Sequence, residues 1–258
     1  MKTLAHLSDL HLGRSPETDL AAVRLRDALH DGRIDHAVVT GDVTNRGRRE
    51  ELARFHELFG PMVRDGRLSV VPGNHDRLGD DVGARLMQGG RVEVLQTHGV
   101  YLVRVDSTGA HNRFLLAGHG DLCERVLDLI DVALDGAPRN MLVVVALHHH
   151  PVPLPTETLP EWVATQLGWP FALELRLGRM LLERLRNRCD LVLHGHRHVP
   201  RALSFFEALR RPLRLFNAGC STALERFRVF SHAAGALVGE PFWLETRPEP
   251  AVRYAEVR

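Results

Sequence analysis

The chain has 258 residues, of which 44% are hydrophobic and 25% are charged, and its formal net charge is +1. These values are typical of a globular protein with a sizeable core. The near-neutral charge argues against a broad basic surface for nucleic acid, although it leaves a local basic groove open. The three cysteines are far apart, so neither a disulfide framework nor a paired-cysteine zinc site is indicated. The first residues do not form a signal peptide, and the most apolar run, 141–147, is much shorter than the roughly 20 residues that cross a bilayer. We therefore expect a cytoplasmic protein without a membrane span.

The first two-thirds of the chain alternate apolar runs with amphipathic ones. Short apolar or β-branched runs predict buried strands at 4–8, 36–40, 68–71, 141–147 and 191–193. Apolar residues at helical spacing predict helices between them, over 16–31, 52–59, 122–133 and 173–188. Ser15 and Pro16 mark the start of the first helix, and Gly60 and Pro61 are expected to stop the second. This order favours largely parallel strands covered by helices.

The pattern changes at about residue 200. Four further runs predict strands joined by turns, at 213–216, 226–230, 242–246 and 252–257. We interpret the chain as one domain over 1–258 with a β-rich C-terminal part, because the candidate ligands extend from residue 9 to residue 198.

Five of the predicted strands lead directly into polar motifs. These motifs are Asp9-Leu10-His11, Gly41-Asp42, Gly73-Asn74-His75-Asp76, His148-His149-His150-Pro151 and His194-Gly195-His196-Arg197-His198. Sites in open α/β sheets gather at the carboxyl ends of the strands, so the five motifs should meet in one crevice. The 16 histidines could reflect composition bias alone. Their clustering beside Asp, Asn and Gly favours metal binding.

The mixture of carboxylate, amide oxygen and imidazole suits manganese, iron or zinc better than an all-oxygen magnesium or calcium cage. The D-x-H and H-x-H motifs are expected to be extended, with both donors of each motif on one side. Two divalent cations beside Asp9 and Asp42 would retain a formal charge of about +2, which would attract a phosphate anion. They would also lower the pKa of a bridging water toward ~7. The motif glycines either make turns or let the backbone pass close to the site.

In this order the motifs resemble the calcineurin-like metallophosphoesterase superfamily, from residue 4 to about residue 220, including the turn Asn217-Ala218-Gly219. The resemblance implies a four-layer α/β/β/α sandwich of two mixed sheets, with a two-metal site at the carboxyl ends of the strands. The implied metals are Mn²⁺, Fe²⁺ or Fe³⁺, or Zn²⁺. The implied metal ligands are Asp9, His11 and His198 for one ion, Asn74, His148 and His196 for the other, and Asp42 as the bridge.

The resemblance also implies in-line attack by a hydroxide that bridges the metals. His75 would lie beside the phosphate as a hydrogen-bond donor or general acid, and Asp76 would orient His75. Asn74, His75, His149 and Arg46 are the candidates for contact with the substrate. His149 could instead support the ligands from behind, and Arg46 could belong to a solvated loop in the basic run Arg46-Gly47-Arg48-Arg49. Of the three consecutive histidines, alignment on the following proline selects His148 as the ligand.

One departure bears on the substrate. Where protein phosphatases of this superfamily have G-D-x-x-D-R-G, this chain has Asn45 in place of the second aspartate. The sequence looks closer to the bacterial phosphodiesterase branch, which includes class III cyclic-nucleotide phosphodiesterases. We therefore expect a phosphodiesterase acting on a small phosphodiester. The alternatives are a phosphomonoesterase, a nucleotide-sugar pyrophosphatase, a DNA nuclease or a non-catalytic scaffold, although a scaffold would be expected to have lost ligands.

The segment 151–170 contains Trp162 and Trp169 and connects a ligand strand to a helix. It can be interpreted as a lid or a homodimer contact near the site, or as a loop whose tryptophans pack on the core. The arginines of the predicted helix 173–188 fit a solvated face better than a phosphate-binding one.

Overall fold

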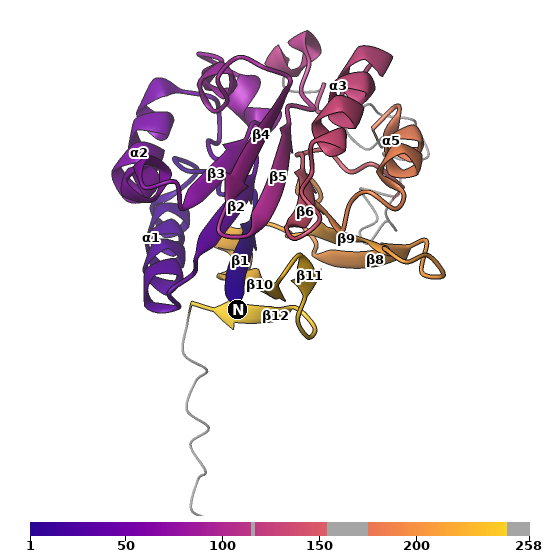
Figure 1. Ribbon diagram of the computed structural model, residues 1–258. Coiled ribbons are helices and arrows are strands. Elements are labelled where there is room, and N and C mark those ends of the chain that lie inside the picture. The colour runs from indigo at the N-terminus through magenta and orange to yellow at the C-terminus, as the bar shows by residue number, and fades with distance from the viewer. Residues whose placement is uncertain (115–116, 154–174, 247–258) are drawn as a thin grey trace, which may run out of the picture.

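The computed structural model describes residues 1–114, 117–153 and 175–246 (Figure 1). Two mixed sheets form its centre. The first has the order β11-β10-β1-β2-β3, with β12 also paired to β10. Its strands are β1 (Lys2–Leu7), β2 (His36–Thr40), β3 (Leu68–Val71), β10 (Arg226–Ala233), β11 (Ala236–Leu237) and β12 (Phe242–Glu245). Strands β1, β2 and β3 are parallel, whereas β10 is antiparallel to β1.

The second sheet has the order β4-β5-β6-β7-β9-β8. Its strands are β4 (Val92–Thr97), β5 (Val100–Val105), β6 (Leu142–Ala146), β7 (Leu191–His194), β8 (Arg201–Phe205) and β9 (Leu213–Asn217). The four central strands are parallel, and β4 and β8 are antiparallel edge strands. Both sheets are therefore mixed, as expected from the resemblance.

The two sheets pack face to face. Leu4 and Val38 from the first sheet share one buried apolar cluster with Leu102 and Val144 from the second. Helices α1 (Pro16–Asp31) and α2 (Arg49–Arg64) cover the outer face of the first sheet. Helices α3 (Glu124–Asp135) and α5 (Gly178–Leu185) cover that of the second (Figure 1). This arrangement is the expected four-layer α/β/β/α sandwich.

The described residues also form short helical turns: η1 (His75–Arg77), η2 (Val82–Arg85), η3 (Ala110–Arg113) and α6 (Ser221–Leu224). Helix α1 begins as predicted, because the Ser15 hydroxyl accepts a hydrogen bond from the Thr18 amide at 3.3 Å and Pro16 follows it.

The predicted stop of the second helix at Gly60 and Pro61 was wrong. Helix α2 continues through Pro61 to Arg64, and its apolar face extends to the buried Met62. Core packing of this face outweighs the hydrogen bond that a proline removes. Helix α5 is also shorter than predicted, since it ends at Leu185 and Asn187 has a left-handed backbone.

Four of the described strands were missed: β4, β5, β8 and the two-residue β11. Both edge strands, β4 and β8, have partly exposed residues along their length and lack the continuous apolar run that marked the buried strands. The predicted strand at 252–257 and the tryptophan segment lie outside the described residues. Each of the three cysteines is a free thiol.

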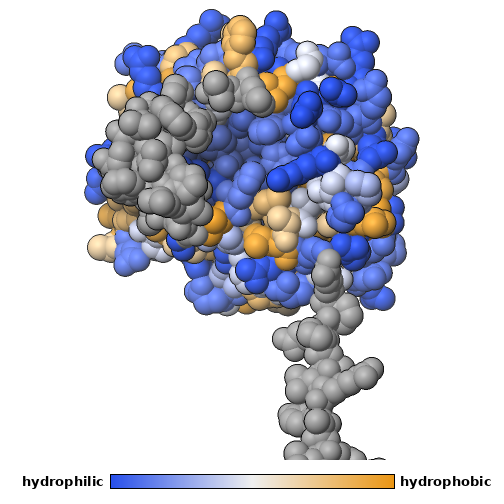
Figure 2. All heavy atoms as spheres, turned by 180° about the vertical axis from the view of Figure 1, so that it is seen from behind, coloured by the Kyte–Doolittle hydropathy of each residue, from blue (hydrophilic) through white to orange (hydrophobic). Residues whose placement is uncertain are grey.

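The face shown in Figure 2 is mostly hydrophilic, and its coloured hydrophobic residues lie in small separate groups. In the part of the chain that the structure describes, no helix combines the length and apolarity needed to cross a membrane.

Candidate metal centre

The seven candidate ligands lie just beyond the carboxyl ends of five strands, β1, β2, β3, β6 and β7. Donor atoms within 4.8 Å of one another form four overlapping groups: Asp9, His11 and His198; His11, Asp42 and His75; Asp9, Asp42 and His148; and His148, His149 and His196. Asn74 joins them through contacts with His148 and His196. The fold therefore brings together all the side chains that the motifs singled out as ligands.

One half of the cluster is formed by Asp9, His11 and His198. Nε2 of His11 lies 3.2 Å from Nε2 of His198. Oδ1 of Asp9 lies 3.4 Å from Nε2 of His198 and 3.9 Å from Nε2 of His11. This oxygen is buried and has no hydrogen-bond partner among the described residues. An orphaned carboxylate oxygen facing two imidazole nitrogens is suited to a cation, because burial without a partner would otherwise be costly.

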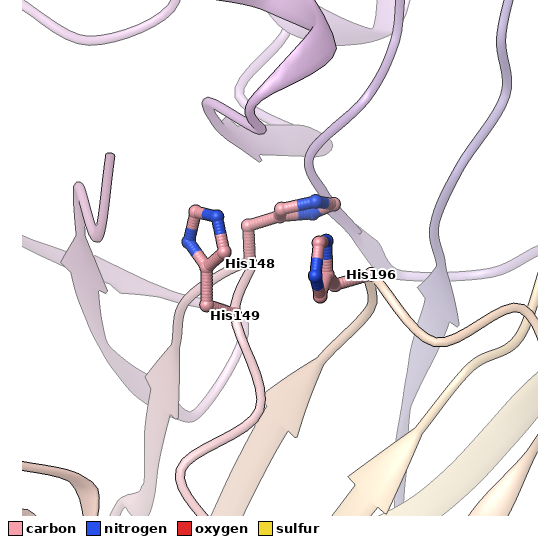
Figure 3. Close-up of side chains that lie close together, drawn as sticks. All are labelled: His148, His149 and His196. Atoms are coloured by element: carbon pink, nitrogen blue, oxygen red, sulfur yellow. The ribbon is translucent and has the colours of Figure 1, made fainter. Parts of the chain in front are cut away.

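The other half is formed around Asn74. Its Oδ1 lies 3.1 Å from Nε2 of His148 and 3.0 Å from Nδ1 of His196. Nδ1 of His148 donates to the Thr40 carbonyl at 2.7 Å. This bond fixes the tautomer and leaves Nε2 as the ligand nitrogen. Figure 3 shows that His148 and His149 project from one loop in different directions, with His196 beside them.

Asp42 lies between the two halves. Its Oδ2 is 3.4 Å from Nε2 of His148, and its Oδ1 accepts the His75 amide at 2.8 Å. It also belongs to the groups that contain Asp9 and His11. This position is the one that a bridging ligand would need.

The backbone of the ligand motifs differs from the prediction. Asp9, His11, Asp42 and His196 all have positive φ, at 54°, 47°, 51° and 70°. The interpretation of D-x-H and H-x-H as extended segments was therefore wrong. The left-handed conformation costs on the order of 1–2 kcal/mol per residue. In the first motif it is held by the Asp9 amide bonding to the Gly41 carbonyl and the His11 amide to the Asp42 carbonyl.

Two glycines allow the close packing of these loops. Gly41 has φ +91°, and a Cβ on it would lie 2.5 Å from Nδ1 of His148. A Cβ on Gly195 would lie 1.8 Å from the Ser8 hydroxyl oxygen. Close backbone approach therefore explains both glycines, and a turn conformation adds to it at Gly41.

The electrostatics keep both carboxylates ionised. Burial raises the pKa of Asp9, but its close interaction with His198 outweighs burial and leaves it at about 2. Burial also opposes ionisation of Asp42, yet His148 and His75 hold its pKa well below the usual value. Burial lowers the pKa of His148, but the Asp42 charge outweighs this effect and raises it to about 9. A cation that binds here would replace the proton on His148.

His75 is held by a different residue from the one expected. Its Nδ1 donates to the Asn45 carbonyl at 2.7 Å, and its ring lies 4.8 Å from that of His11, centroid to centroid. The expectation that Asp76 orients His75 is corrected by this bond.

The Asp76 carboxylate instead accepts the amides of Val43, Thr44 and Gly73 and the Thr44 hydroxyl. Burial and the Asp42 charge raise the pKa of Asp76 to about 6. The Asp76 carboxylate therefore connects, by hydrogen bonds, the two loops that carry Asp42 and Asn74.

His149 is occupied on both ring nitrogens, by the Ser107 hydroxyl at 2.8 Å and the Gly118 carbonyl at 3.0 Å. The ring is buried, so the expected substrate contact is not made available by this arrangement. The Ser107 hydroxyl also accepts the amides of His148 and His149. Sequence reasoning missed Ser107, because it follows β5, which was not recognised as a strand. The end of that strand would have been the signal.

Arg46 is exposed, and its side chain makes no ion pair within the described ranges. Its backbone amide donates to Glu51. The structure thus leaves the predicted phosphate contact of Arg46 as a prediction.

Comparisons with known proteins identify the family of this chain. The calcineurin-like phosphoesterase family model matches residues 2–200. A relative from Pseudomonas aeruginosa, the 3',5'-cyclic adenosine monophosphate phosphodiesterase CpdA, is 30% identical over 237 residues, which cover 86% of this chain and 76% of the relative.

Two solved structures share the fold. A dimetal phosphatase from Danio rerio superposes with a TM-score of 0.64 at 12% identity, over 95% of this chain and 99% of the other. A purple acid phosphatase from yellow lupin seeds gives 0.66 at 11% identity, over 95% and 51%. The family model and the relative show the family, whereas these two structures, at 12% and 11% identity, show the fold alone. This chain belongs to the calcineurin-like phosphoesterases, a family of dinuclear metal-dependent hydrolases of phosphate esters.

Proposed function

We propose that this protein is a phosphodiesterase that hydrolyses a small phosphodiester with the aid of two divalent cations, with Mn²⁺, Fe²⁺ or Fe³⁺, or Zn²⁺ as candidates. The observation that carries the proposal is the convergence of seven donor side chains in one cluster, in which Oδ1 of Asp9 has no hydrogen-bond partner among the described residues. The likeness to a cyclic-nucleotide phosphodiesterase and the asparagine at position 45 favour a diester over a phosphoprotein.

The residues present fit two ions. Asp9, His11 and His198 would hold one, Asn74, His148 and His196 the other, with Asp42 between them. Oxygen and imidazole donors without thiolate suit manganese, iron or zinc. When bound, the ions would supply Lewis-acid charge and lower the pKa of a water toward neutrality.

His75 is the best candidate for moving a proton. Because its Nδ1 donates to the Asn45 carbonyl, Nε2 is the nitrogen left to face the cluster. In its protonated form, His75 can give the Nε2 proton to the leaving oxygen of the ester. The bond from the His75 amide to Asp42 fixes the residue beside the site.

The deciding experiment compares hydrolysis of bis-p-nitrophenyl phosphate with that of p-nitrophenyl phosphate, on chelator-stripped protein reloaded with manganese. We expect manganese-dependent turnover that favours the diester. Cyclic nucleotides are then the first natural substrates to test, given the activity named for the relative. A preference for the monoester would contradict the diester assignment while leaving the family intact. Absence of both bound metal and activity would favour the scaffold alternative.

A further inference from the structure

A second charged concavity lies at the opposite end of the second sheet. It has a volume of about 830 Å³ and is lined by Arg139, Arg210, Arg211 and Arg214, together with Asp190 and the Gly235 turn. Its arginines and Asp190 precede β6, β7 and β9 or lie at their amino ends, whereas His148 and His196 follow β6 and β7. A strand of five residues at about 3.3 Å each places the two sites roughly 15 Å apart or more. The concavity is therefore separate from the metal centre.

Two of the arginines are held in place. Arg211 donates from Nε and one terminal nitrogen to the Asp190 carboxylate at 2.6 and 2.8 Å, and from the other to the Arg188 carbonyl at 3.1 Å. Asp190 is itself fixed by the Val143 amide at 2.7 Å. A guanidinium has five N–H donors, so Arg211 retains two for a ligand.

Arg214 is the second fixed arginine. Its guanidinium lies over the Phe216 ring, 5.2 Å from the centroid. Its carboxylate partner is Glu240, whose side chain is 81% exposed. Such a surface ion pair is weak and readily exchanged for a better anion.

The other two arginines, Arg139 and Arg210, are exposed, and neither makes an ion pair with any residue that the structure describes. Four arginines against Asp190 and Glu240 leave a formal surplus of two positive charges, which exceeds the +1 of the whole chain. Fixed guanidinium groups beside adaptable ones, in a concavity of this size, are suited to an anion with several phosphate oxygens.

We propose that this concavity, the distal arginine pocket, binds a compact polyphosphate anion, either free or as the phosphate chain of a nucleotide. The proposal is independent of the reaction at the metal centre. It rests on the four arginines that line the concavity of about 830 Å³.

The test is calorimetric titration of inorganic triphosphate into the chelator-stripped full chain. We expect one saturable site whose affinity falls at least about tenfold in the double variant Arg139→Gln/Arg210→Gln, because two charge-assisted contacts are lost. The matched control is Arg64→Gln/Arg125→Gln, which removes two exposed arginines elsewhere and should change affinity by less than about twofold. Both pairs are surface substitutions, and thermal melting checks that each variant folds.

Three results would overturn the proposal. They are no saturable binding, an equal loss of affinity in both double variants, or a loss of binding in Asn74→Ala, which would put the anion in the metal centre. Adenosine triphosphate distinguishes the two sources. Tighter binding than triphosphate, with the same dependence on Arg139 and Arg210, would assign a nucleotide, and equal binding would assign the free anion. A single-stranded oligonucleotide that binds more tightly than either would replace the small anion with nucleic acid.

Discussion

Two buried histidines at opposite ends of the strands show what separates a candidate ligand from a core residue. His36 lies at the amino end of β2, and His148 follows the carboxyl end of β6. Both are fully buried. His36 donates from Nδ1 to the Gly66 carbonyl at 3.1 Å, and its Nε2 pairs with the Ser69 hydroxyl at 3.0 Å. His148 has only Nδ1 on the backbone, and its Nε2 faces Asn74 and Asp42.

Burial alone therefore does not distinguish these two histidines. What distinguishes them is the group that faces the second ring nitrogen. The pKa values separate the two residues in the same way. Burial lowers the pKa of His36 to about 4, whereas the Asp42 charge outweighs burial and raises that of His148 to about 9. At His148 the second nitrogen faces the Asn74 and Asp42 oxygens of the cluster, whereas at His36 both ring nitrogens already have neutral hydrogen-bond partners.

Removal of the Asp42 carboxylate should have the largest effect on the metal centre. We expect Asp42→Ala to lose both metals and to reduce diester hydrolysis to background, because one of only two anionic ligands disappears from between the two halves. Metal content per chain after dialysis, measured by plasma mass spectrometry, checks this. Asp27→Ala on the exposed face of α1 is the control. Retention of one or more ions per chain would contradict the bridging role.

The next largest effect is expected at His75. His75→Ala should keep both metals and slow turnover by ~10²–10⁴-fold, as the loss of a positioned general acid does. The exposed His56 on α2 provides the matched His→Ala control. Unchanged turnover with metals bound would make His75 a bystander, and loss of metal would make it a ligand.

A substitution at Ser107 tests whether its hydrogen bonds help to position the loop that carries His148 and His149. Ser107→Ala removes the partner of Nδ1 of His149 and the acceptor for two amides. We expect metal affinity or activity to fall by about 10-fold, at the lower end of what outer hydrogen bonds contribute. Metal titration of stripped wild-type and variant protein measures this, and equal affinities and rates would show that the hydroxyl has no positioning role.

The role of His36, at the amino end of β2, can be tested through the stability of the protein in acid. The pKa of folded His36, about 4, lies below the unfolded value of about 6.5. The unfolded state therefore takes up the proton first, and stability present above pH 6.5 is lost as the pH falls toward 4. Between pH 7 and pH 5 the loss from this residue is about 2 kcal/mol. Urea unfolding of stripped wild-type and His36→Gln protein at both pH values should show a smaller pH dependence in the variant. An identical dependence would mean that His36 does not titrate as proposed.

Particular residues show how far the sequence could lead. The five motifs predicted the cluster because each follows a strong apolar strand, and parallel strands bring their ends together. The left-handed backbone at Asp9 and His11 could not be predicted, because it is imposed by bonds to the loop after β2, a partner distant in sequence. Ser107 was missed with its strand. Asp76 was assigned to the wrong partner, because adjacency to His75 in sequence says nothing of where a carboxylate turns.

The smallest effect is expected at Arg46, which is neither a buried core residue like His36 nor a buried candidate ligand like His148. It belongs to a ligand loop, yet its side chain is exposed and makes no ion pair with the residues described. An exposed guanidinium can attract a phosphate ester only through a screened interaction. We therefore expect Arg46→Ala to raise KM by roughly threefold or less, with kcat unchanged. The increase should disappear at high salt, because screening removes a long-range attraction. Arg49→Ala, in the same basic run, is the matched control. A KM that rises by more than about 10-fold and persists in salt would instead indicate direct contact between Arg46 and the substrate phosphate, as the resemblance predicts.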